Sequence, residues 1–81
     1  MQLIKTHDGI YGLKYEGRPV IWCSDKEEMI RIGWANFAKK ATNHGEAVFK
    51  RDVETALRYM AENGHTIAHF GVFGSFIFTE L

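Results

Sequence analysis

The sequence predicts an α+β fold, a two-layer sandwich in which two helices pack on one face of an antiparallel sheet. Three observations lead to this prediction. Short β-forming runs separated by turn dipeptides fill the first 23 residues. Apolar residues then recur at three- and four-residue spacing between residues 30 and 60. An uncharged, phenylalanine-rich segment from Thr66 to Thr79 closes the pattern. With 81 residues, the chain is expected to form a single domain, residues 1–81.

Three short strands are expected first, joined as an antiparallel meander. Leu3–Thr6 is a weak β signal, and the turn dipeptide Asp8-Gly9 separates it from Ile10–Tyr15. A second turn at Glu16-Gly17 leads to the β-forming run Pro19–Cys23. The proline that opens this run has no amide proton to donate. It is therefore expected at the start of a strand or on an edge.

A capping box predicts where the first helix begins. Ser24 can accept a hydrogen bond from the third amide of the helix, and Glu27 can reach back to the Ser24 amide. One apolar stripe follows at helical spacing, formed by Ile30, Gly33, Trp34, Phe37, Ala38 and Ala41. The polar run at residues 42–45 is expected to end this helix.

The segment after residue 45 admits two interpretations. In the first, a second helix begins near Glu46 with Asn43 as its cap. Its buried stripe would be Phe49, Val53, Ala56, Leu57 and Met60. In the alternative, Glu46–Phe49 is a short strand and Asp52 caps a shorter helix. Both versions end at Asn63-Gly64, because glycine adopts the backbone conformation of a helix stop at little cost.

The C-terminal segment holds four of the six phenylalanines and also admits two interpretations. It is either one long strand kinked at Gly71 and Gly74, or a hairpin that turns through Gly71–Gly74. Read as a strand, it is apolar on both faces, with Ala68, Phe70, Val72, Phe76 and Phe78 on one and Ile67, Phe73 and Ile77 beside His69 and Ser75 on the other. Since two helices shelter one face only, Phe73 is expected to remain exposed.

The leading functional hypothesis is a small non-catalytic module that binds another protein, as an inhibitor or adaptor. Contiguous exposed apolar surface usually marks an interaction site, and aromatic side chains are favoured anchors. The predicted partner-binding residues are Phe73, Ile77, Trp22, Tyr11, Lys14 and Arg18. A second copy of the chain is another expected occupant. Viral, phage-like accessory proteins that inhibit host defence enzymes are built on this scale, which is an analogy of size alone.

A nucleic-acid-binding role is an alternative, based on the basic segment between Arg31 and Arg51. Five basic residues there accompany one acid, Glu46, and would contact phosphates: Arg31, Lys39, Lys40, Lys50 and Arg51. Ten basic residues and ten acidic ones balance over the whole chain, which disfavours this alternative.

A zinc site is a weaker alternative, with Cys23, His44, His65 and His69 as the four ligands. Structural zinc sites usually draw their ligands in close pairs from turns, and only the last two fit that pattern. We expect no cofactor and no catalytic residue, since the sequence contains no phosphate-binding glycine loop and no activated nucleophile.

The lone thiol and the N-terminal residues favour the cytoplasm. A single cysteine, Cys23, suits a reducing compartment. Lys5 and Asp8 interrupt any signal-peptide core. The apolar C-terminal segment is shorter than the ~20 residues that a membrane-spanning helix needs, so no membrane partner is expected.

Overall fold

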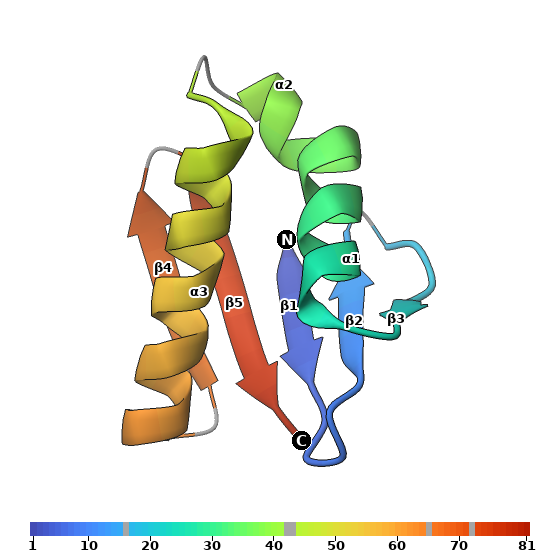
Figure 1. The fold of residues 1–81 in the computed structure, drawn as a ribbon, viewed down its shortest axis with the longest axis vertical. Coiled ribbons are helices and arrows are strands. Elements are labelled where there is room, and N and C mark those ends of the chain that lie inside the picture. The colour runs from blue at the N-terminus through green and yellow to red at the C-terminus, as the bar shows by residue number, and fades with distance from the viewer. Residues whose placement is uncertain (16, 42–43, 65, 72) are drawn as a thin grey trace.

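Five strands form one sheet, and the helices lie together on one of its faces (Figure 1). The computed structural model describes residues 1–15, 17–41, 44–64, 66–71 and 73–81, with the side chains of residues 41, 66–71, 74 and 75 left aside. The strands are β1 Gln2–Lys5, β2 Tyr11–Lys14, β3 Ile21–Cys23, β4 Thr66–Gly71 and β5 Gly74–Glu80. The predicted two-layer α+β class is therefore confirmed.

The sheet has the order β3-β2-β1-β5-β4 and is mixed rather than purely antiparallel. The N-terminal meander is antiparallel as predicted, but β1 and β5 pair in parallel, with Leu3 opposite Phe78. The expectation of an all-antiparallel sheet is thus wrong at one pair. The reason is that the last strand of the C-terminal hairpin inserts beside β1. In this position β5 pairs with β4 on one edge and with β1 on the other. On the β1 side, the Ile77 amide donates to the Met1 carbonyl at 3.0 Å.

The first predicted turn, Asp8-Gly9, is confirmed, whereas Glu16 of the second lies outside the described residues. The Gly9 amide donates to the Thr6 carbonyl at 3.1 Å, and Gly9 has a φ of 92°, a conformation that favours glycine. Pro19 precedes β3, which is an edge strand. The C-terminal segment is a hairpin rather than one long strand, because Gly71 pairs with Gly74 across a two-residue connection.

The first helical run comprises α1 Lys26–Gly33, a π-helical turn η1 Trp34–Ala38, and a short α2 Lys39–Ala41. Asp25 rather than Ser24 occupies the cap, since its carboxylate accepts from the Glu28 amide at 2.8 Å. The Ser24 hydroxyl instead donates to the Glu28 carboxylate at 2.7 Å. The predicted cap was wrong by one residue because Asp25 brings a charged acceptor to the positive end of the helix.

The π-helical turn η1 carries two aromatic side chains that face the core. Within it, the Asn36 side-chain amide donates to the Ile32 carbonyl one turn earlier at 2.9 Å. Trp34 and Phe37, at either end of this segment, both pack against the buried cluster.

The second helix, α3, runs without interruption from Glu46 to Asn63. The continuous interpretation is confirmed, and the alternative with a strand at Glu46–Phe49 is wrong. Gly45 holds the cap position that was expected of Asn43, which lies outside the described residues. Gly64 ends the helix at a φ of 145°, and its amide donates to the Met60 carbonyl at 3.1 Å.

Aromatic rings from the helices and the C-terminal hairpin meet between the two layers. This ring cluster consists of Trp34, Phe37, Phe49, Phe73, Phe76 and Phe78. Phe49 lies at its centre, with ring centroids 5.3 Å from Phe73 and 5.8 Å from Phe76 in edge-to-face arrangements. Such pairs stabilise a core beyond the area they bury. The ring cluster therefore attaches the C-terminal hairpin to both helical segments.

The expectation that Phe73 is exposed is wrong, because its side chain is 1% exposed. Phe73 does sit at the hairpin turn, as one interpretation required, but its ring turns inward against Phe49 and Trp34. The physical reason is that the helices contribute large rings of their own, Trp34 and Phe49, and these enclose Phe73 at the hairpin turn. The side chain of Phe70, which the sequence places on the face opposite Phe73, lies outside the described side chains.

Replacing Phe73 with alanine should destabilise the fold by about 3–5 kcal/mol, the usual cost of deleting a buried phenylalanine ring. Urea unfolding followed by circular dichroism measures this change. Ile77→Ala, on the adjacent strand and 46% exposed, is the matched control and should cost about 1 kcal/mol or less. Equal losses for the two variants would show that Phe73 is not in the core.

Candidate functional site

The face of the sheet opposite the helices is uncovered in the part of the chain that the structure describes (Figure 1). Side chains alternate along a strand, and the register aligns Trp22, Gly12 and Ile4 across three strands of this face. We call it the open sheet face and define it by seven described residues: Gln2, Ile4, Gly12, Lys14, Trp22, Ile77 and Thr79. Ile4 is only 8% exposed but does not belong to the core cluster under the helices.

Trp22 lies across Gly12 on the open sheet face. A Cβ atom added at Gly12 would stand 2.9 Å from Cζ3 of the Trp22 ring. Any side chain at position 12 would therefore displace the indole. Although fixed in this way, Trp22 remains 53% exposed. The sequence analysis missed Gly12, yet a glycine inside a predicted strand is a signal of close approach.

The six predicted partner-binding residues do not form one surface. Trp22, Ile77 and the exposed Lys14 lie on the open sheet face. Phe73 belongs to the ring cluster.

Tyr11 and Arg18 also lie away from the open sheet face. Tyr11 is half-buried and packs against the core cluster on the helical side. The Arg18 guanidinium lies 5.7 Å from the ring centroid of Tyr15, in the connection between β2 and β3. The structure thus keeps Trp22, Ile77 and Lys14 as one candidate surface.

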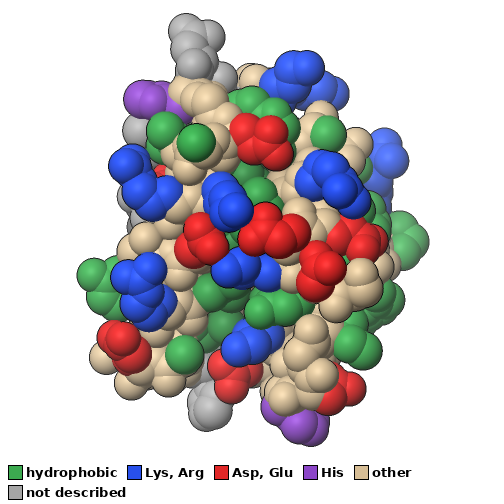
Figure 2. Space-filling model, viewed as in Figure 1, with side chains coloured by type: hydrophobic (Ala, Val, Ile, Leu, Met, Phe, Trp, Pro, Cys, Tyr) green, Lys and Arg blue, Asp and Glu red, His purple; other side chains and the backbone are tan. Residues whose placement is uncertain are grey.

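The helical face carries a mixture of charges, and Figure 2 shows acidic and basic side chains interspersed over the helices. Lys50, one of the five predicted nucleic-acid contacts, pairs with Glu27 at 3.1 Å. Lys26 and Glu54 form a second bridge between α1 and α3 at 2.7 Å. Alternating signs of this kind are typical of a solvated surface rather than of a phosphate-binding strip.

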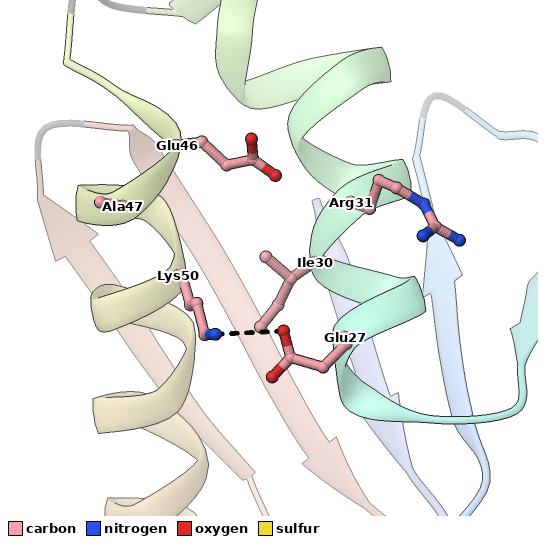
Figure 3. A pocket seen from close by; sticks show the side chains of 6 residues that line it. All are labelled: Glu27, Ile30, Arg31, Glu46, Ala47 and Lys50. Atoms are coloured by element: carbon pink, nitrogen blue, oxygen red, sulfur yellow. Dashed lines mark ion pairs between the residues drawn. The ribbon is translucent and has the colours of Figure 1, made fainter.

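A groove of about 380 Å³ separates α1 from α3 and is lined by Glu27, Ile30, Arg31, Glu46, Ala47 and Lys50 (Figure 3). Glu46 reaches into this groove, whereas the Arg31 guanidinium points away from α3. Two of the four charged residues already neutralise each other through the Lys50–Glu27 pair. The groove therefore offers few converging polar groups to a small ligand.

Of the four predicted zinc ligands, the structure describes the side chains of two, Cys23 and His44. Cys23 is buried in the core cluster, and His44 is exposed, with its ring 6.5 Å from that of Phe73. His65 and the side chain of His69 lie outside what the structure describes. Among the described residues, no three His, Cys, Asp or Glu side chains are grouped as a metal site requires.

Cys23 has the environment of a structural thiol. Burial, together with the negative charges of Glu28 and Asp25, raises its pKa above the ordinary value. The thiolate, which is the nucleophilic form, is therefore disfavoured.

Comparisons with known proteins give this chain no relative: no family model, curated protein or solved structure matches it. Among the described residues, no helix has both the length and the apolar character needed to cross a bilayer.

The Cys23 thiol should react with an aromatic disulfide reagent at least roughly a hundredfold more slowly in the native protein than in the unfolded chain. Burial and the raised pKa both lower the accessible thiolate. Absorbance of the released thiol, with and without denaturant, measures the ratio. Similar rates in the two states would contradict the buried position.

The Lys26–Glu54 bridge should make stability depend on pH in a defined direction. The hydrogen bond from Lys26 lowers the pKa of Glu54 below its ordinary 4.5. The contribution of Glu54 is therefore fully present above pH 4.5 and is lost as the pH falls through the lowered pKa.

Glu54→Gln should remove this part of the acid sensitivity, as judged by thermal unfolding between pH 2 and pH 7. Glu62→Gln, a change of the same kind on an exposed glutamate of α3, is the matched control. A Glu54→Gln profile that parallels the wild-type curve would show that the pair contributes nothing.

Proposed function

We propose that this chain is a non-catalytic protein-binding module that docks through the open sheet face, with Trp22 as its anchor. One observation carries the proposal: the helices cover a single face of the sheet, and a tryptophan 53% exposed stands on the other. Trp22 and Ile77 are among the exposed large hydrophobic side chains of the described chain. Exposed aromatic and aliphatic surface of this kind marks interaction sites more often than chance.

The packing of Trp22 suits an anchor. Tryptophan is enriched among the residues whose truncation costs the most binding energy. Contact with Gly12 already restricts the indole, so less conformational freedom is lost when a partner binds. Ile4 lies on the same face two strands away in register, with Gly12 between them.

Charge on the open sheet face indicates the chemistry of the partner. Lys14 is the one charged residue among the seven that define the face. A protein surface with an apolar pocket bordered by a carboxylate would complement it. Occupying such a pocket would make the module an inhibitor or an adaptor. We propose the cytoplasm as its compartment, because a single unpaired thiol suits a reducing environment.

Trp22→Ala should weaken partner binding by about 2 kcal/mol, or roughly 30-fold in Kd. Gly12→Ala should weaken binding as well, because the added methyl group displaces the indole ring without removing the tryptophan from the chain. Proteins captured by immobilised wild-type chain are compared with those captured by the two variants. Affinities of the proteins that differ are then measured calorimetrically.

Tyr59→Ala, which removes an exposed aromatic ring from the helical layer, serves as the matched control and should leave binding unchanged. Circular dichroism confirms that each variant is folded. Partners that bind wild-type and Trp22→Ala protein equally well would refute docking through the open sheet face.

A further inference from the structure

One edge of the sheet lacks the features that normally protect an edge. β4 ends the strand order, and β5 is its single strand neighbour within the described residues. Its six residues contain no formally charged side chain and no proline, whereas charges and prolines commonly block edges. The opposite edge, β3, has only three residues and follows Pro19 closely. The β4 edge is thus the one suited to accept another strand.

One side of α3, the helix that packs over β4, lies above the same edge of the sheet. Lys50 and Glu54 pair with α1, so they mark the side of α3 that faces α1. The opposite side, at helical spacing, carries four residues that we call the α3 flank: Val48, Asp52, Thr55 and Tyr59. Tyr59 is 56% exposed and is among the exposed large hydrophobic residues. Because α3 packs on β4 and β5, the α3 flank lies on the same side of the molecule as the β4 edge (Figure 1).

We propose that a second copy of this chain joins along this side, with the two β4 strands antiparallel and the two α3 flanks in contact. A two-fold axis perpendicular to the sheet relates the copies and keeps all helices on one face. Adjacent strands are about 4.8 Å apart. A helix centred over β4 and β5 would then lie roughly 10 Å from its symmetry mate, which is a normal helix packing distance.

Size and charge favour a second copy as the occupant. The Cα trace extends 32 by 22 Å along this side. A side of this extent is of the order that an interface burying ~800 Å² on each partner requires. The chain has no net charge, so two copies approach without long-range repulsion. In an isologous contact the two identical edges pair with each other, so neither edge remains free to bind a further copy.

Analytical ultracentrifugation of the full chain between about 1 μM and about 1 mM tests the proposal. We expect a reversible dimer of the 9.3 kDa chain, and we expect Tyr59→Lys to raise its Kd by at least about tenfold. Tyr59 is exposed in the monomer, so this variant should remain folded. Trp22→Ala should leave the dimer unchanged, which separates this interface from the open sheet face.

Hydrogen exchange provides a second measurement that does not depend on a variant. Amides of β4 that point away from β5 should exchange more slowly at high protein concentration than at low concentration. A monomer at every concentration would overturn the proposal. A dimer that resists Tyr59→Lys but dissociates on Trp22→Ala would also overturn it.

Discussion

The ring cluster is the interaction on which the rest of this structure depends. Phe49 of α3 contacts Phe73 at the turn of the C-terminal hairpin, Phe76 in β5 and Trp34 of the π-helical turn. Within the sheet itself, the hairpin is joined to the other strands through the parallel β1–β5 pairing. An 81-residue chain buries little more than half of its unfolded surface, so a few large rings supply much of its stability.

Placing the C-terminal rings in the core changes which surface is available for binding. The protein does expose large apolar side chains, but those of the sheet lie on the open sheet face rather than at the hairpin turn. They are Trp22 and Ile77, and Ile4 and Gly12 lie on the two strands between theirs. The helical side is different, because charged residues of both signs cover it and two ion pairs link α1 to α3. The two faces of this small domain therefore differ in chemistry, and only one is suited to an apolar contact.

Local signals in the sequence were enough to predict most of the elements. Turn dipeptides and helical periodicity placed the meander and both helices, because those features depend on neighbouring residues. The parallel β1–β5 pair and the inward ring of Phe73 depend on contacts between distant segments. No local pattern reports such contacts. In the candidate site, Trp22, Ile77 and Lys14 were identified from the sequence, and Gly12 could have been, as a glycine inside a strand, whereas Ile4 is assigned to this face only by the register.

Solvent paramagnetic relaxation in solution NMR tests the central claim most directly, because one spectrum reports on both groups of side chains. A soluble paramagnetic probe should strongly relax the indole of Trp22 and the methyl groups of Ile77. The ring protons of Phe73, Phe76 and Phe78 should be nearly unaffected, since these side chains are buried. If Phe73 relaxes as strongly as Trp22, the ring cluster does not hold the hairpin as described, and the account fails.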